Sequence, residues 1–323
     1  MPVLVSVVIP TYNRAHVIGR ALRSCRQQSL RDFEIVIADD EKSTDGIAEA
    51  VAAFPELSIR LLSGVRGKAA AARNAGVRAA AGTYIAFLDS DDEFLPHKLD
   101  ACVAVLERGD ADAVYSRTYV ECGVGRLWVK PARGIAAGED IASYLFVDQG
   151  WVHPSTLVLP RSWALSSPFA EGLGYGDDAQ FAIDLVHAGA RLKMIEEPLA
   201  IYHDTGAADH LSLSVFFEDF ESSNNKAFVD WMEGKRALIP ERAYLAFKVR
   251  VLARMIARRR PAEALAHLWR AYRGGAFGLA KSLYYAVQVF CPRLFREGRN
   301  LVVRWRGRPR PGRARQLLER QQG

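Results

Sequence analysis

The chain has 323 residues, a charged fraction of 25% and an aromatic fraction of 10%, which argue for a folded protein and against a disordered one. The net charge of +6 conceals two unlike parts. Residues 235–323 hold 22 Lys and Arg against 4 Asp and Glu, a net charge of +18, whereas residues 1–234 carry −12. This division predicts an acidic catalytic part followed by a basic part that meets an anionic surface.

The four cysteines are widely spaced and form no CxxC pair, which argues against a disulfide framework and against a zinc site. The first residues are too short and uncharged for a signal peptide. The longest apolar run, 276–294, is interrupted by Lys281 and Pro292, so we expect no spanning helix. The sequence therefore predicts a cytoplasmic protein.

Apolar runs and helical segments alternate through the first 90 residues, which predicts parallel βαβ units with helices on both faces of a sheet. The predicted strands are 3–9, 33–38, 58–62 and 83–88, and the predicted helices are 16–28, 44–53 and 68–81. Three of these strands end in polar residues, at 10–14, 39–40 and 89–92. Ligands of such sheets bind beyond the carboxyl ends of the strands, so the three polar ends should line one crevice.

The alternation weakens after residue 110. We expect strands at 113–120, 127–129, 155–159, 192–195 and 199–202, and helices at 139–147 and 178–188. From about residue 213 the pattern is helical and basic, with helices expected at 243–260, 262–272 and 279–290. The Arg- and Pro-rich stretch 304–320 is expected to be mobile.

Asp89, Asp91 and Asp92 place three carboxylates directly after a predicted buried strand. Carboxylates packed so closely repel one another, and a divalent cation such as Mg²⁺ or Mn²⁺ would neutralise them. The alternative is a solvated acidic turn that precedes a helix. Asp39 and Asp40 have a similar alternative as a simple turn.

These segments are more informative when they are considered together. The strings SVVIPTYNRA, FEIVIADDEKSTDG and RGKAAAARNAGVRAAAGTYIAFLDSDD resemble, in order and spacing, the family 2 inverting glycosyltransferases of the GT-A fold. A weaker likeness continues through HPSTLVLPRS, GYGDDAQFAIDLVHAG and EPLAIYHD. The resemblance implies an α/β fold with a mostly parallel central sheet. It implies a catalytic domain at 1–214, followed by a basic helical region at 215–323.

The resemblance also implies a site. The nucleotide of a sugar donor, a UDP-sugar by the family pattern, would be held by Pro10, Thr11, Tyr12, Arg14, Asp39, Asp40, Arg73, Asp89 and Ser90. The cation, Mn²⁺ or Mg²⁺, would be bound chiefly by Asp91, with Asp89 and with His203, or His210 as second choice. The catalytic base would be Asp178, with Asp177 as its neighbour and the next residue to test.

Two departures from the family pattern concern the site. The second strand is usually followed by DDGS, whereas this chain has Asp39-Asp40-Glu41-Lys42. Around the base the family commonly has Glu-Asp-x-Asp, whereas this chain has Asp177-Asp178-Ala179-Gln180. Both changes leave the expected reaction class intact but make the acceptor harder to identify.

The basic region mixes Arg with aromatic residues, as an interfacial helix on anionic lipid does. A helical cap packed on the core is the alternative. We expect a glycan or glycolipid acceptor, as in a bacterial surface glycan or lipopolysaccharide, and no nucleic acid, because no reader motif is present. Two rival functions remain open: a nucleotidyltransferase that makes an activated sugar, and a non-catalytic module that binds nucleotide or lipid.

Overall fold

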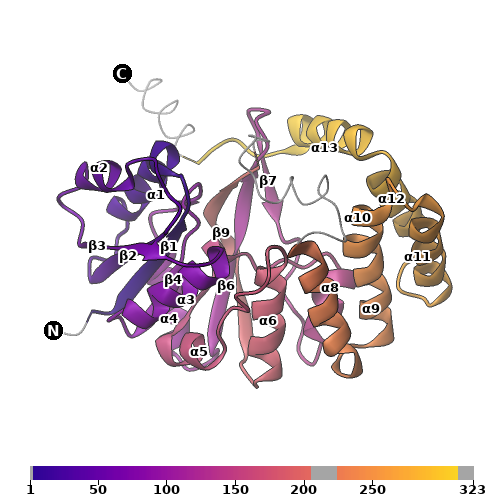
Figure 1. Ribbon diagram of the computed structural model, residues 1–323, viewed down its shortest axis with the longest axis horizontal. Coiled ribbons are helices and arrows are strands. Elements are labelled where there is room, and N and C mark those ends of the chain that lie inside the picture. The colour runs from indigo at the N-terminus through magenta and orange to yellow at the C-terminus, as the bar shows by residue number, and fades with distance from the viewer. Residues whose placement is uncertain (1–2, 205–223, 312–323) are drawn as a thin grey trace.

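A computed structural model describes residues 3–204 and 224–311. Its centre is a nine-stranded sheet with the order β3-β2-β1-β4-β8-β6-β9-β5, and β7 pairs with β6 (Figure 1). The strands are β1 Val5–Thr11, β2 Phe33–Asp40, β3 Ile59–Val65, β4 Tyr84–Phe87, β5 Glu93–Phe94, β6 Ala113–Glu121, β7 Leu127–Lys130, β8 Val158–Pro160 and β9 Leu192–His203. This architecture confirms the predicted α/β fold.

The first half of the sheet is parallel, as its apolar runs predict. Strand β1 pairs with both β2 and β4, and all seven of its residues are buried because layers cover both faces. The covering helices are α1 Ala15–Arg26, α2 Ile47–Ala52, α3 Ala69–Ala79 and α4 Lys98–Glu107. Helix α3 lies so close to β1 that a Cβ on Gly76 would stand 2.4 Å from Val8 Cγ1, which explains the glycine. The register sets Thr11 opposite Asp39.

The second half of the sheet is mixed, and here two predictions were wrong. The expected strands 192–195 and 199–202 form one strand, β9, because the register shift around Arg117, opposite Pro198, accommodates a residue that cannot donate to the ladder. The expected helix 139–147 is instead largely a π-helical turn, η1 Ser143–Val147. Strand β8 runs antiparallel between β4 and β6 and follows the 3₁₀ turn η2, Pro154–Thr156.

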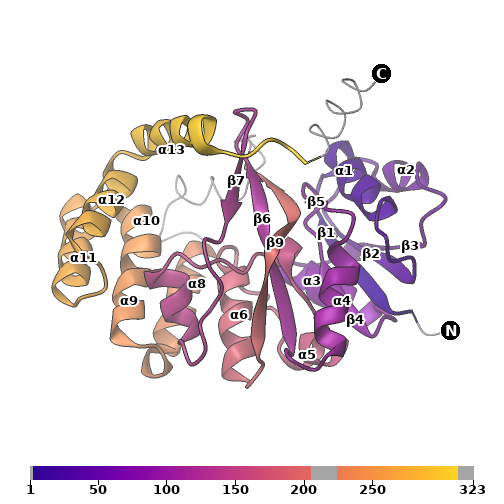
Figure 2. The same cartoon turned by 180° about the vertical axis from the view of Figure 1, so that it is seen from behind.

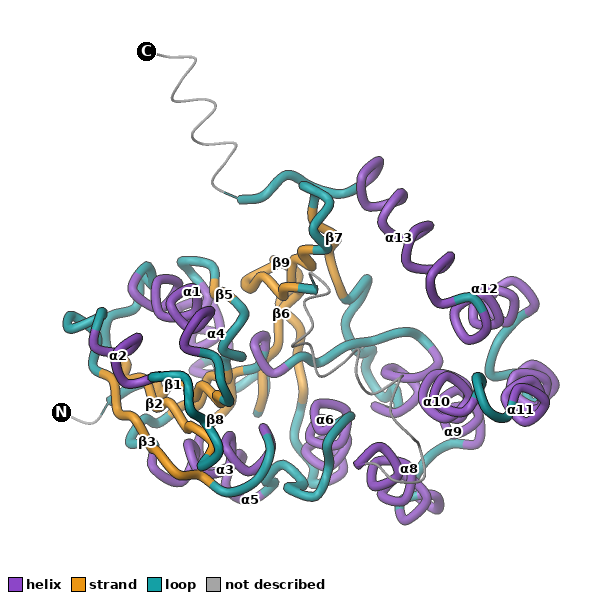
Figure 3. Tube along the Cα trace, turned by 45° about the horizontal axis from the view of Figure 1, so that its top comes forward, coloured by secondary structure: helices purple, strands orange, loops and turns teal. Residues whose placement is uncertain are grey.

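Beyond the sheet lie α5 Arg161–Ser166, α6 Asp177–His187 and a C-terminal group of helices. That group consists of α8 Asn224–Gly234, η3 Arg236–Leu238, α9 Glu241–Phe247, η4 Lys248–Ala253, α10 Arg254–Ile256, α11 Pro261–Arg273, α12 Leu279–Phe290 and α13 Pro292–Arg306. Figure 3 shows α8–α12 on the side of the sheet away from β3. Helix α13 includes residues 304–306, which were expected to be mobile, whereas 312–320 lie outside the described residues.

One apolar core joins the C-terminal helices to the sheet. It contains Phe146 and Phe247, whose ring centroids lie 5.4 Å apart in edge-to-face contact, and Phe228, whose ring lies 5.5 Å from that of Phe247. Helices α8 to α11 thus pack as a continuation of the core rather than as a separate body. Among the described residues, no helix combines the length and the apolar character that crossing a membrane requires.

The chain after α13 returns to the sheet (Figure 2). Leu127 of β7 and Arg308 exchange backbone hydrogen bonds, each of 2.8 Å. Two residues later, Arg310 forms an ion pair with Glu93 of β5. We call residues 307–311 the return segment, and it ends beside the acidic turn that follows β4.

Candidate functional site

The ends of β1 and β2 form the first wall of the site. Asp39 is buried and accepts hydrogen bonds from the hydroxyls of Thr11 (2.6 Å) and Ser43 (2.7 Å), so this carboxylate holds the two strand ends together. Asp40 is only partly buried and accepts from the Lys42 N–H at 2.9 Å. The Tyr12 side chain is 54% exposed. Asp40 and Tyr12 are therefore open to a ligand, whereas Thr11 and Asp39 hold the wall in place. Pro10 is buried within β1 beside Ala38.

The acidic turn after β4 forms the floor. Ser155 of η2 ties it to the sheet, because its hydroxyl donates to Asp92 at 2.5 Å and accepts from the Asp89 N–H at 3.0 Å. Ser90 is buried within this turn. Asp91 is partly exposed and lies 3.5 Å from the Arg14 guanidinium, which links the floor to the first wall. The three polar strand ends that were expected to lie together are thus in contact, through Thr11 with Asp39 and through Arg14 with Asp91.

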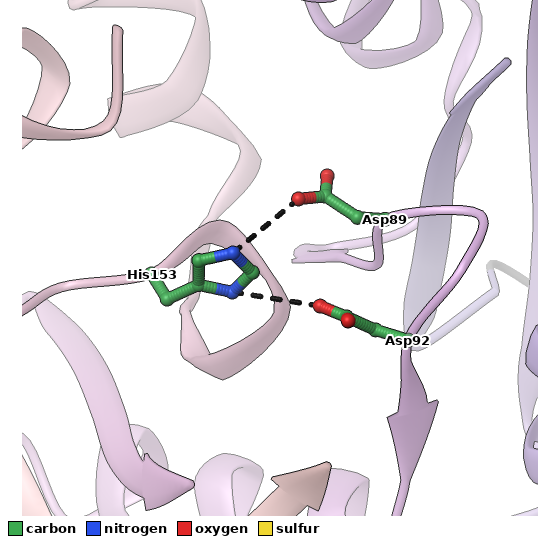
Figure 4. A group of neighbouring side chains, drawn as sticks. All are labelled: Asp89, Asp92 and His153. Atoms are coloured by element: carbon green, nitrogen blue, oxygen red, sulfur yellow. Dashed lines mark ion pairs between the residues drawn. The ribbon is translucent and has the colours of Figure 1, made fainter. Parts of the chain in front are cut away.

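Asp89, Asp92 and His153 form a compact group in which the possible metal-ligand atoms all lie within 4.8 Å of one another. Figure 4 shows the imidazole of His153 between the two carboxylates, with Nε2 3.5 Å from Asp89 and Nδ1 3.6 Å from Asp92. Burial lowers the pKa of His153, in spite of the attraction of Asp89, so the ring is neutral and able to donate a lone pair. Burial and the negative charges of Asp91 and Asp89 raise the pKa of Asp92.

This donor set fits a divalent cation. Carboxylate oxygens suit Mg²⁺ and Mn²⁺, and a neutral imidazole suits the transition metals. A cation would also relieve the repulsion that raises the pKa of Asp92.

The group differs from the expected ligands Asp91, Asp89 and His203. His203 is buried at the end of β9, where its Nε2 lies 2.8 Å from Glu93 and its backbone N–H donates to Asp92 at 3.2 Å. It therefore contacts the turn without joining the group. His210 lies outside the described residues. Sequence reasoning missed His153, because nothing in the stretch HPST indicates that it folds next to the acidic turn.

Arg73 of α3 connects the floor to the opposite wall. Its Nη2 donates to Asp89 at 2.6 Å and its Nη1 to Asp177 at 2.5 Å, while its buried Nε has no hydrogen-bond partner among the residues that the structure describes. Two of its nitrogens are thus occupied by protein carboxylates rather than directed at a donor. The two ion pairs outweigh burial and raise the pKa of Arg73, so its charge is permanent.

Asp177 and Asp178 open helix α6, which forms the second wall. The preceding Gly176 has φ 77°, and a Cβ there would stand 2.4 Å from the Phe228 ring, so only glycine allows this entry. Burial and the charge of Asp177 raise the pKa of Asp178 to about 6, although hydrogen bonds from the Ala179 N–H and the Trp151 indole oppose the rise. A carboxylate with this pKa is ionised near neutrality and still basic enough to accept a proton.

Trp151 is a second residue that sequence reasoning missed. Besides donating to Asp178, its ring packs against His153 at 4.8 Å and edge-on against Tyr202 at 5.2 Å. Trp151 therefore contacts His153 of the Asp89–Asp92–His153 group as well as the Asp178 carboxylate. No pattern in the sequence around Trp151 indicates that its side chain lies at the site.

Comparisons with known proteins identify the family of the chain. Residues 6–165 match the model of glycosyl transferase family 2. The chain is 36% identical over 208 residues to the amylovoran biosynthesis glycosyltransferase AmsB of Erwinia amylovora, a match that covers 61% of this chain and 69% of AmsB.

Two solved structures share the fold. TarS 1–349 of S. aureus in complex with UDP-GlcNAc has a TM-score of 0.50 at 17% identity, with 79% of this chain and 81% of TarS covered. The mannosyltransferase PcManGT of Pyrobaculum calidifontis in complex with GDP-Man and Mn²⁺ has a TM-score of 0.52 at 19% identity, with 94% and 84% covered. On the strength of the family match and the likeness to AmsB, the chain belongs to glycosyl transferase family 2.

Proposed function

We propose that this protein transfers a sugar from a nucleotide-diphosphate donor, with UDP as the nucleotide, to an acceptor hydroxyl with inversion and with the help of a divalent cation. The observation that carries the proposal is the arrangement of two walls around the acidic turn. An accessible Asp40 and Tyr12 lie on one side, and Asp178, with a pKa of about 6, lies on the other.

The first wall carries side chains that could bind the nucleotide of the donor. Tyr12 can stack on a base, and the Asp40 carboxylate can accept the imide N–H of a uracil. The TarS structure contains UDP-GlcNAc and the PcManGT structure GDP-Man, which supports a nucleotide-sugar donor. We assign the nucleotide to Pro10, Thr11, Tyr12, Arg14, Asp39, Asp40, Asp89 and Ser90, and we assign to Arg73 the role of bracing the site.

In the transfer step, the Asp178 carboxylate accepts the proton of the acceptor hydroxyl as its oxygen attacks the anomeric carbon. Asp177 is ionised and paired with Arg73, and its negative charge helps to raise the pKa of Asp178. Asp89, Asp92 and His153, with Asp91 in the same turn, would hold Mn²⁺ or Mg²⁺, and the cation would offset the charge that gathers on the leaving diphosphate. Attack opposite the leaving group inverts the anomeric centre, so no covalent nucleophile is needed.

We further propose that the acceptor belongs to a bacterial surface glycan and that the protein works at a membrane surface. The name of AmsB, a glycosyltransferase of amylovoran biosynthesis, supports the first part. Exposed apolar side chains of α12 and α13 support the second, since large apolar patches on a surface mark interaction sites. These side chains are Leu279, Leu283, Tyr284, Val287, Phe290, Leu294, Leu301, Val302 and Trp305.

The division into a catalytic part, 1–214, and a basic part, 215–323, belongs to the same proposal. In that division α12 and α13 form the membrane-facing layer, and α8 to α11 attach this layer to the catalytic part through the shared apolar core.

A thermal-shift screen of nucleotide sugars with and without Mn²⁺ tests the donor proposal, because a ligand that binds the folded state raises the midpoint. We expect a UDP-sugar to raise the midpoint most, and more with Mn²⁺ than with EDTA. Incubation of that donor with acceptor and analysis of the product anomer then tests inversion. A midpoint that responds to nucleoside triphosphate and sugar phosphate instead would favour a nucleotidyltransferase. Binding without donor turnover would favour a non-catalytic module.

A further inference from the structure

The end of β9 contacts the acidic turn at two adjacent residues. The backbone N–H of His203 donates to Asp92 Oδ1 at 3.2 Å, and the imidazole Nε2 of His203 lies 2.8 Å from Glu93 Oε1. Asp92 belongs to the group that can hold a cation, and Glu93 directly follows it. The orientation of the Asp92 carboxylate therefore depends on how firmly His203 is held against the turn.

The strand ladder at this place is short. β5 has two residues, Glu93 opposite Ile201 and Phe94 opposite Ala200, and it stands at the end of the sheet order. Most strands are longer, and the backbone of an edge strand has ladder partners on one side. Side-chain contacts between β5, β9 and their surroundings must therefore supply part of the rigidity of the turn.

Two arginines from the C-terminal part of the chain supply such contacts. The Arg310 guanidinium donates to Glu93 Oε1, the same oxygen that faces the His203 imidazole. Arg299 of α13 pairs at 2.6 Å with Asp204, the residue that follows His203. The end of β9 and its neighbour β5 are thus each held by a cation that comes from beyond residue 290.

The backbone of the return segment holds Arg310 in place. Its side chain is 42% exposed, and an ion pair of this kind often contributes little, because ordering a long side chain costs entropy. Here Leu127 and Arg308 exchange two backbone hydrogen bonds, and Arg126 Nε donates to the Gly307 carbonyl at 2.6 Å. The return segment is therefore docked on β7 two residues before Arg310, which reduces the entropy that the ion pair must overcome.

We propose that Arg310 is a positioning residue of the cation site. By holding Glu93 against His203 it sets the Asp92 carboxylate, and so raises the affinity of the site for Mn²⁺ or Mg²⁺. This inference rests on the proposed function and extends its site to the return segment. That segment lies beyond residues 6–165, which the family model matches.

The charge of Arg310 and its positioning role have opposite effects on cation binding. Loss of a positive charge beside an acidic turn, taken alone, increases the attraction for a divalent cation. Loss of a contact that orients a metal ligand decreases the affinity. The direction in which the dissociation constant for Mn²⁺ changes therefore separates the two effects.

The test is a titration of the full-length protein with Mn²⁺, with and without UDP, in which electron paramagnetic resonance measures the free Mn²⁺. Arg310→Gln removes the ion pair with Glu93, whereas Arg310→Lys keeps a cation that can form it. Arg308→Gln is the matched control. It removes the same charge from an exposed side chain of the return segment, whereas the hydrogen bonds of Arg308 with Leu127 are made by the backbone.

We expect Arg310→Gln to raise the dissociation constant for Mn²⁺ about threefold, which is the scale of one partly exposed ion pair. Arg310→Lys should stay near the wild type, and Arg308→Gln should not raise the constant. In a Glu93→Gln background, Arg310→Gln should have no further weakening effect, because a contact that is already lost cannot be lost again.

Three results would overturn the proposal. They are an unchanged or lowered constant in Arg310→Gln, an equal rise in Arg308→Gln, and a rise in Arg310→Gln that persists in the Glu93→Gln background. The midpoint of thermal unfolding without metal should be alike in Arg310→Gln and Arg308→Gln, so that general destabilisation does not account for a difference in Mn²⁺ binding.

Failure of this inference differs from failure of the proposed function. If the wild type bound no Mn²⁺ even with UDP present, cation-assisted transfer would be wrong, and the inference would fall with it. If the wild type bound Mn²⁺ with UDP and Arg310→Gln bound it equally well, the proposed function would stand. Only the positioning role of Arg310 would then be wrong.

Discussion

Arg73 and Asp177 are 104 residues apart in the sequence, yet the Arg73 guanidinium lies 2.5 Å from the Asp177 carboxylate. The same guanidinium holds Asp89 at 2.6 Å. One buried cation therefore fixes the distance between the acidic turn and the start of α6. Because Asp177 is engaged in this way, Asp178 is the member of the pair that remains available to accept a proton.

Replacement of Asp178 by Asn should lower transfer by at least about 10²-fold, since the proposed general base is lost. The fold should become more stable at pH 7.5. Asp178 has a pKa raised to about 6, so its stabilising contribution is complete only while it is protonated and is lost as pH rises through 6. A shift of about two pKa units corresponds to at most about 3 kcal/mol in the free energy of unfolding. The Asn variant avoids this loss because its side chain does not ionise.

The midpoints of thermal unfolding at pH 7.5 and pH 4.5 check this prediction, and the advantage of the variant should shrink at the lower pH. Asp177→Asn is the control, because it removes a carboxylate but leaves the base. Transfer near the wild-type level in Asp178→Asn would place the base elsewhere.

The rate of transfer should fall on the acid side of pH about 6, by tenfold for each further unit, because protonated Asp178 cannot accept a proton. Asp177→Asn should move this limb to lower pH, since the negative charge of Asp177 raises the pKa of Asp178. A pH profile of kcat/KM for both proteins measures the effect. Identical acid limbs would contradict the coupling between the two carboxylates.

Trp151→Phe should preserve most of the ring contacts with His153 and Tyr202 and remove the hydrogen bond to Asp178. That hydrogen bond lowers the pKa of Asp178, so its loss should move the acid limb to higher pH. We expect kcat to fall about tenfold or more near neutrality, with little change in the KM of the donor. A variant with normal kcat and an unmoved limb would show that Trp151 only packs.

Mn²⁺ titration of donor turnover can distinguish the proposed metal ligands from one another. Asp91→Ala should abolish metal-dependent turnover with the fold intact, because Asp91 is partly exposed at the site. His153→Ala should raise the half-saturating Mn²⁺ concentration by about tenfold or more, because loss of a ligand or its support costs this much. His203→Ala, whose imidazole contacts Glu93, should have a smaller effect. A larger effect of His203→Ala than of His153→Ala on the half-saturating Mn²⁺ concentration would indicate that His203 is the ligand.

Membrane binding by α13 can be tested with a pair of charged variants. Leu301 and Trp305 lie one turn apart on α13 and are 59% and 83% exposed, so Leu301→Asp/Trp305→Asp should reduce sedimentation with phosphatidylglycerol vesicles. The control Leu165→Asp/Leu238→Asp adds the same charge at exposed positions outside α12 and α13. High salt should release part of the wild-type protein, since each engaged cation contributes about 1 kcal/mol. Equal binding to neutral vesicles would refute the electrostatic part.

The parallel half of the fold could be predicted because it depends on local patterns. The apolar runs before Pro10 and Asp39 are buried on both faces, so their strand ends could be expected to meet. The place of His153 could not, because it depends on β8 inserting antiparallel between β4 and β6, a pairing that no local pattern specifies. The return segment, with its Arg310, was missed for the same reason.

The return segment has a consequence for how the protein is made. Glu93 acquires its partner Arg310 from a segment translated 217 residues later, and Phe146 likewise awaits Phe247. On a ribosome, the sheet is therefore complete well before the ion pair between Glu93 and Arg310 can form. Contacts between such distant segments slow folding, because the entropy of closing the intervening loop opposes them. A nascent chain that lacks α9 to α13 would expose the apolar side of η1 and α8. Such a chain would be bound by chaperones before its site for a sugar nucleotide is complete.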